Sequence, residues 1–150
     1  MEKKEIIQHV IDSHNLMHIA TVDAAGAPHV RGVDYVGGDE ENTLLFITNR
    51  ASRKIEHIRN NPAVSVAIDR DCPEWEELAK LQYIKGSGTA EILEDPQDVQ
   101  DVFSRLVVKF PFFKDFPVDA AQFVAVRVRL QEVYLTDNTI SFGHTDTIRY

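Results

Sequence analysis

Short polar turns separate the apolar stretches in the first third of the chain, and they decide how the strands pair. Residues 18–22, 29–36 and 43–48 have the composition of β-strands, and the segments between them contain Gly, Asp, Asn and Pro. Turns of this kind join strands that are neighbours both in sequence and in space. The pattern therefore predicts a meander of antiparallel hairpins.

The second half of the chain predicts further strands of the same kind. Residues 64–68 form a short apolar stretch and residues 81–93 a long one, in which residues 86–88 read Gly-Ser-Gly and indicate a bulge or a sharp bend. Residues 123–136 alternate between aliphatic and polar or small residues, which is typical of a strand with one buried face. After a tight turn, residues 139–143 are expected to form its short partner strand.

Three helices are predicted between these strands. Apolar residues recur at helical spacing in residues 3–14, and a second helix follows Ser52 and stops at residues 60–62, which read Asn-Asn-Pro. Asp95 precedes a third helix, whose apolar face extends to Phe110. Six or seven strands in neighbouring pairs with inserted helices predict a mainly β protein, a small antiparallel barrel, with residues 1–150 in a single domain.

Charge and composition exclude several classes of function. The 150 residues carry a net charge of −8, which is the wrong sign for nucleic-acid binding. No apolar run is long enough to span a membrane and the first residues do not resemble a secretory signal, so we expect a cytoplasmic protein. The single cysteine, Cys72, excludes an intrachain disulfide and a cysteine-cluster metal site, and we predict no metal site of another kind.

The start of the second helix carries positive charge where a helix disfavours it. Ser52 is a good N-cap, and Arg53 and Lys54 occupy the first turn with Arg50 just outside it. Free backbone N–H groups already give this end of a helix a partial positive charge. A bound anion such as a phosphate would remove the conflict, and a solvated helix start with surface cations is the alternative.

The segment at residues 111–117, Pro-Phe-Phe-Lys-Asp-Phe-Pro, is too aromatic for an ordinary surface loop. It is expected to cap the core, to line a pocket or to contact a partner subunit. We favour the core or an interface.

Several short motifs occur in one order along residues 15–93. They are Arg31-Gly32-Val33, Ile47-Thr48-Asn49, Ser52-Arg53-Lys54, the Asn-Pro-Ala-Val-Ser-Val run at residues 61–66, and Gln82. This order is similar to the FMN-binding split β-barrels of the pyridoxamine 5′-phosphate oxidase family. The resemblance implies a six- to seven-stranded split barrel with FMN bound at the interface of a homodimer.

The resemblance also implies roles for individual residues. Arg53 and Lys54 would bind the FMN phosphate, with Ser52 close by and Arg31 on the phosphate or the ribityl chain. The backbone from Arg31 through Gly32 to Val33, and at Ile47 and Thr48, would follow the edge of the isoalloxazine ring, and Gln82 would contact the ring.

Two departures from the oxidase pattern bear on the reaction. The oxidase has a substrate-holding lysine where this chain has Val36, and it has a C-terminal tryptophan and arginine, whereas the only tryptophan here is Trp75. Oxidation of pyridoxamine phosphate is therefore not expected. The sequence identifies no catalytic residue, although Asp34, Tyr35 and His144 are candidates to face a substrate.

Two classes of function follow from the resemblance. The first is an FMN-dependent oxidoreductase or reductase acting on an unidentified small molecule. The second is a protein that binds flavin, haem or a deazaflavin without turnover, as a carrier or a stress-related sensor. An interaction domain with an empty cofactor groove is a third possibility.

Overall fold

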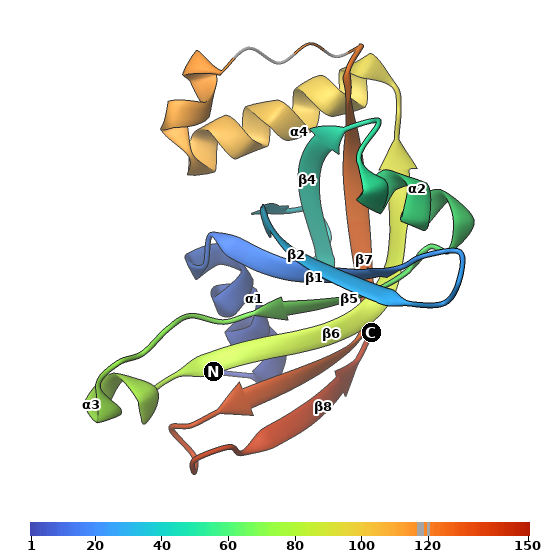
Figure 1. Ribbon diagram of the computed structural model, residues 1–150. Coiled ribbons are helices and arrows are strands. Elements are labelled where there is room, and N and C mark those ends of the chain that lie inside the picture. Colours follow the sequence, from blue (N-terminus) through green and yellow to red (C-terminus); the bar gives the residue numbers. More distant parts are fainter. Residues whose placement is uncertain (117–118, 120) are drawn as a thin grey trace.

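One antiparallel sheet of eight strands, curled into a half-barrel, forms the body of the protein (Figure 1). The computed structural model describes residues 1–116, 119 and 121–150. The strands are β1 (Leu16–Val22), β2 (Pro28–Asp34), β3 (Val36–Gly37), β4 (Thr43–Asn49), β5 (Ala63–Ile68), β6 (Gln82–Leu93), β7 (Phe123–Asp137) and β8 (Thr145–Arg149). The predicted mainly β split barrel is confirmed.

The barrel is split between two strands that follow each other in sequence. The strand order is β2-β1-β5-β6-β7-β4-β3, with β8 paired to β7. The path thus begins at β2 and ends at β3, and in the chain Tyr35 is the one residue between these two strands. The sheet has one strand more than the upper expectation, because the predicted strand at residues 29–36 is divided at this residue.

Helices cover the two faces of the sheet. They are α1 (Lys3–Ser13), α2 (Arg53–Asn60), α3 (Trp75–Leu78), α4 (Pro96–Lys109) and the 3₁₀-helix η1 (Pro111–Asp115). The predictions for α1, α2 and α4 are confirmed, and the Asp95 carboxylate caps α4 by accepting from the Gln97 N–H at 2.9 Å. The short helix α3 was not predicted. No helix among the described residues has the length and apolar character that crossing a membrane requires.

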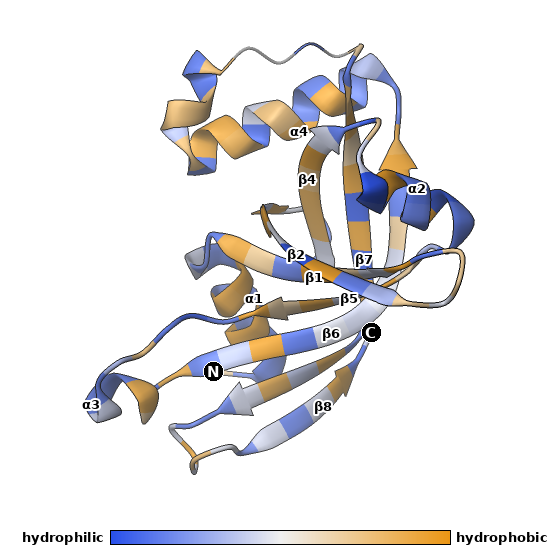
Figure 2. Ribbon diagram, in the orientation of Figure 1, coloured by the Kyte–Doolittle hydropathy of each residue, from blue (hydrophilic) through white to orange (hydrophobic). Residues whose placement is uncertain are grey.

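Strand β4 separates two hydrophobic clusters. Leu44 and Phe46 point into the main core, which lies between α1, α2 and the sheet. Leu45 and the partly buried Ile47 point to the other side, where α4 packs over β4 and β7. Because both faces of β4 are covered, the four residues 44–47 in its middle are all apolar, and Figure 2 shows this stretch in the hydrophobic colour.

The predicted irregularity in β6 is present. The register between β6 and β7 shifts between Ser87 and Gly88. A Cβ atom on Gly88 would lie 1.9 Å from the backbone oxygen of Arg129, so only glycine fits this close approach.

The predicted strand at residues 139–143 is wrong. This segment is a turn, and the partner of β7 is β8, which begins at Thr145. Side chains at the end of β7 and just after it hold the turn: the Asp137 carboxylate accepts from the Thr139 N–H at 3.0 Å, and the Asn138 Oδ1 accepts from the Gly143 N–H at 2.8 Å.

Candidate functional site

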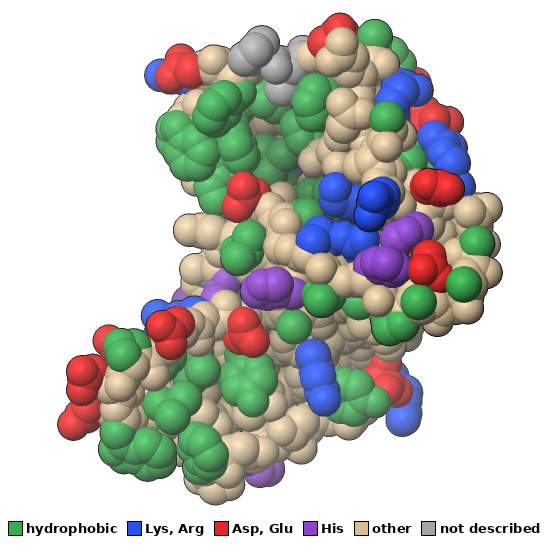
Figure 3. Space-filling model, in the orientation of Figure 1, with side chains coloured by type: hydrophobic (Ala, Val, Ile, Leu, Met, Phe, Trp, Pro, Cys, Tyr) green, Lys and Arg blue, Asp and Glu red, His purple; other side chains and the backbone are tan. Residues whose placement is uncertain are grey.

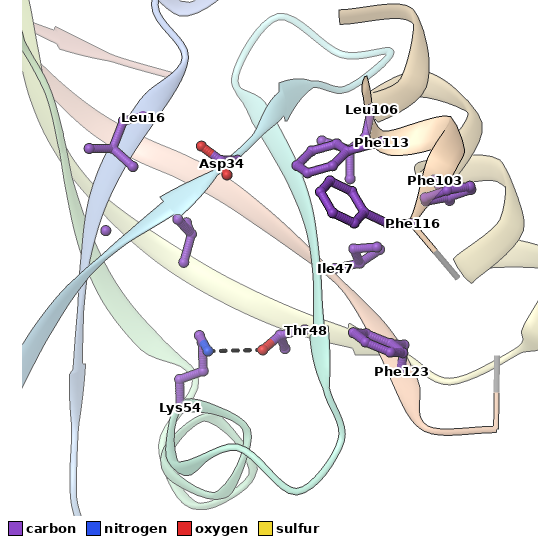
Figure 4. Close-up of a pocket in the computed structure, with 12 residues that line it drawn as sticks. Leu16, Asp34, Ile47, Thr48, Lys54, Phe103, Leu106, Phe113, Phe116 and Phe123 are labelled. Carbon is purple, nitrogen blue, oxygen red and sulfur yellow. Dashed lines mark hydrogen bonds between the residues drawn. The ribbon is translucent and has the colours of Figure 1, made fainter. Parts of the chain in front are cut away.

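A cleft of about 340 Å³ lies at the split of the barrel (Figure 4). Strands β1, β2 and β4 and helix α2 form one part of its wall, and α4, η1 and the start of β7 form the rest. Its lining residues are Leu16, Gly32, Val33, Asp34, Ile47, Thr48, Lys54, Phe103, Leu106, Phe113, Phe116 and Phe123. The volume is within the range typical of small-molecule sites.

One end of the cleft is cationic and is formed by Lys54, Thr48 and the neighbouring Arg31. The Lys54 Nζ donates to the Thr48 Oγ1 at 2.9 Å, and the Thr48 hydroxyl donates to the Ser52 Oγ at 3.3 Å. Ser52 is at the N-cap of α2 as predicted, but its side chain makes no capping hydrogen bond. Burial lowers the pKa of Lys54, and the positive charge of Arg31 lowers it further.

Arg31 is half-buried on β2 and is held entirely by neutral oxygens. Its Nη1 donates to the Thr21 Oγ1 at 2.7 Å, the His29 carbonyl at 3.1 Å and the Ile19 carbonyl at 3.3 Å. Burial lowers the pKa of the guanidinium. Among the described residues, no carboxylate lies within 4.0 Å of Arg31 or Lys54, although the chain has a net charge of −8. Figure 3 shows Lys and Arg side chains gathered on this face, with histidines beside them.

Two of the predicted binding residues lie outside the cleft. Arg53 is exposed and lines a separate depression with Glu56 and His57. Consecutive residues of a helix differ by about 100° in direction, and of these two residues only Lys54 lines the cleft. Gln82 lies at the start of β6, where its side chain donates to the Asp137 carboxylate at 3.0 Å, and it borders a different depression.

The other predicted residues come together. Gly32 and Val33 on β2 line the cleft from one side, and Ile47 and Thr48 on β4 line it from another. Ser52 contacts this group through Thr48.

The other end of the cleft is aromatic and is formed by Phe103, Leu106, Phe113, Phe116 and Phe123. The rings of Phe113 and Phe116 have centroids 5.6 Å apart, and Figure 4 shows them facing Ile47 across the cleft from Lys54. Phe113 also packs in the cluster under α4, whereas Phe116 is 54% exposed. The aromatic segment therefore lines a pocket and covers the core; its last residue, Pro117, lies outside the described residues.

Only one of the three candidate substrate-facing residues borders the cleft. Asp34 lines it. Tyr35 is fully buried and its hydroxyl donates to the Ile11 carbonyl at 2.7 Å, so it belongs to the core. His144 lies in the turn before β8, and its Nε2 is 3.0 Å from the carboxylate of Asp146 at the start of that strand. Val36, at the oxidase lysine position, packs against the cluster under α4.

Comparison with known proteins shows the family of the chain. The model of the family described as pyridoxamine 5′-phosphate oxidase matches residues 4–137. The chain belongs to this family. The pyridoxine/pyridoxamine 5′-phosphate oxidase of Alkalilimnicola ehrlichii is 39% identical over 77 residues, which cover 51% of this chain and 36% of that protein. The chain therefore matches only about a third of that curated relative.

Two further relatives match more of the chain. General stress protein 26 of Bacillus subtilis is 26% identical over 114 residues, which cover 76% of each protein. The solved structure of a haem-binding protein from Mycobacterium smegmatis superimposes with a TM-score of 0.78 at 19% identity, covering 99% of this chain and 58% of that one. At this identity the likeness concerns the fold.

Proposed function

We propose that the cleft binds FMN and that the protein is an FMN-dependent oxidoreductase acting on a small molecule. The observation that carries the proposal is the cation pair Arg31 and Lys54, half-buried side by side with no carboxylate partner among the described residues. Burying uncompensated charge is costly, so such a pair indicates that a ligand supplies the negative charge. The phosphate of FMN has the required charge and accepts several hydrogen bonds.

The opposite end of the cleft suits the ring of the same cofactor. Flat aromatic side chains such as Phe113 and Phe116 pack well against a planar tricyclic ring. The residues from Gly32 to Asp34 and at Ile47 offer backbone and apolar side-chain contacts along the wall between the two ends. When bound, FMN supplies two-electron redox chemistry, and the protein supplies its position and surroundings.

We further propose that the protein is a homodimer. Strand β2 is an edge strand, and five of its seven residues are exposed while the other two are partly exposed. Unpaired edges of this length are usually covered. A second copy over this edge would also account for Gln82, whose predicted contact with the ring cannot be made through the cleft of its own chain.

The alternative is a carrier or sensor that binds a cofactor without turnover. It is favoured by Val36, because the site lacks the oxidase's substrate-holding lysine. Haem fits poorly, since no His, Cys, Met or Tyr is found among the described residues that line the cleft and could ligate iron. A deazaflavin also joins a tricyclic ring to a phosphate, and it is therefore the competing cofactor.

Titration of the purified protein with FMN, followed by absorbance and by flavin fluorescence, tests the proposal. We expect saturable binding and a perturbed flavin spectrum. Protein that fails to take up added FMN would overturn the assignment, and uptake of a deazaflavin alone would replace FMN by that cofactor. Anaerobic reduction with NADPH and reoxidation by candidate acceptors, compared with free FMN, then separate a reductase from a carrier.

A further inference from the structure

A buried hydroxyl connects the cationic end of the cleft to a histidine on α2. Thr21 is fully buried, and its Oγ1 lies 2.7 Å from the Arg31 Nη1 and 2.8 Å from the His57 Nδ1. His57 is 8% exposed, so this Thr21–His57 pair lies almost entirely inside the protein.

The chemistry of the guanidinium fixes the direction of one of these hydrogen bonds. A guanidinium can only donate, so the Thr21 oxygen accepts from Arg31. The Thr21 oxygen has a second lone pair, so its hydrogen bond with the His57 Nδ1 can run in either direction. In both directions His57 fixes the position of the hydroxyl that accepts from Arg31.

The surroundings of His57 hold the imidazole in this position. The ring of His29 packs against it with centroids 4.9 Å apart, and the His29 Nε2 is in turn 2.8 Å from the Asp23 carboxylate. The His29 carbonyl also accepts from Arg31 at 3.1 Å. Strands β1 and β2 and helix α2 thus meet around one guanidinium.

All three hydrogen bonds of Arg31 come from Nη1, which leaves Nε and Nη2 without a partner among the described residues. We propose that Thr21 and His57 are positioning residues: they hold Arg31 by one nitrogen so that its other donors are directed to the phosphate beside Lys54. This inference rests on the proposed FMN function and adds two residues to the site, neither of which contacts the cleft itself.

Riboflavin provides the decisive comparison, because it has the same ring and ribityl chain as FMN and lacks the phosphate. Thr21→Val removes the hydroxyl and keeps the shape of the side chain. We expect it to weaken FMN binding about tenfold or more, because Arg31 is no longer directed at the phosphate and one charged hydrogen bond to the ligand is lost, and to leave riboflavin binding unchanged. Thr21→Ser should restore FMN binding.

The same comparison applies to His57. His57→Asn keeps an acceptor near the Nδ1 position and should retain most of the FMN affinity, whereas His57→Leu should lose it as Thr21→Val does. The matched control is Thr136→Val, which removes another buried hydroxyl, paired with the Thr145 Oγ1 at 2.9 Å far from the cleft. It should change neither affinity.

The possible results separate the two proposals. If wild-type protein binds FMN and Thr21→Val leaves the ratio of FMN to riboflavin affinity unchanged, whether both fall or neither falls, the positioning role is refuted and the FMN site stands. If wild-type protein binds no FMN, both proposals fail.

Discussion

Replacing Lys54 by methionine tests the cationic end of the cleft most directly. Methionine keeps a long unbranched chain and removes the charge and the hydrogen bond to the Thr48 hydroxyl. A hydrogen bond to a charged group contributes about 1.5–3 kcal/mol, so the dissociation constant for FMN should rise about 10- to 150-fold. Fluorescence titration with FMN measures this directly, and riboflavin affinity should change little.

The same substitution should have the opposite effect on the protein without cofactor. Burial and the nearby charge of Arg31 lower the pKa of Lys54, which means that the fold disfavours its charged form. Removing that charge should leave the free energy of unfolding of the cofactor-free protein unchanged or higher, while the stabilisation by added FMN shrinks.

Two controls frame this result. Lys80→Met removes an exposed cation outside the cleft and should change neither quantity. Arg53→Met should weaken FMN binding less than Lys54→Met, because Arg53 is exposed and does not line the cleft. Unchanged FMN affinity in Lys54→Met, or an equal loss of riboflavin affinity, would refute the phosphate assignment.

Three other substitutions test the rest of the structure. Phe116→Ala should weaken FMN and riboflavin binding equally, by about 0.5–1.5 kcal/mol in titrations, whereas Phe142→Ala, exposed beyond the end of β7, should affect neither. Gly88→Ala should lower the free energy of unfolding in urea by about 1–3 kcal/mol or more, because its Cβ would meet the Arg129 carbonyl; wild-type stability would show that the bulge adapts. Burial lowers the pKa of His14 below 6.5, so between the folded-state pKa and 6.5 the unfolded chain binds a proton that the folded protein does not. The contribution of neutral His14 to the free energy of unfolding is therefore complete above pH 6.5 and is lost as pH falls toward the folded-state pKa. Stability curves of wild type and His14→Asn should therefore converge on acidification, and parallel curves would contradict the shift.

Local patterns in the sequence were sufficient for most elements of the fold. Strand alternation and helix caps depend on nearby residues, which is why α1, α2, α4 and the bulge in β6 were predicted. The C-terminal hairpin failed because Ile140 and Phe142 alternate with polar residues as in a strand. In the structure both are more than 60% exposed, and the turn is held instead by side-chain hydrogen bonds of Asp137 and Asn138.

For the site, the sequence predicted the types of the binding residues better than the directions in which their side chains point. Two adjacent cations at a helix start both suited a phosphate, and only the orientation of α2 distinguishes Lys54 from Arg53. The sequence does not predict Phe103, Leu106 and Phe123 as cleft residues. Phe103 and Leu106 lie on the apolar face of α4, and packing of that face against the core explains their types equally well. The excess of aromatic residues after α4 was the sequence signal for this end of the cleft, but the sequence alone favours a core or interface role for that segment.

The two ends of the cleft are built by different parts of the chain. The cationic end depends on β1, β2 and the start of α2, where Arg31, Thr21 and His57 are connected through buried hydrogen bonds. The aromatic end exists because the outer face of β4 needs a cover, and α4 with η1 supplies it. If FMN binds as proposed, substitutions in α4 and η1 should therefore change the affinities for FMN and riboflavin alike, because they alter the aromatic end of the cleft and leave Arg31 and Lys54 in place.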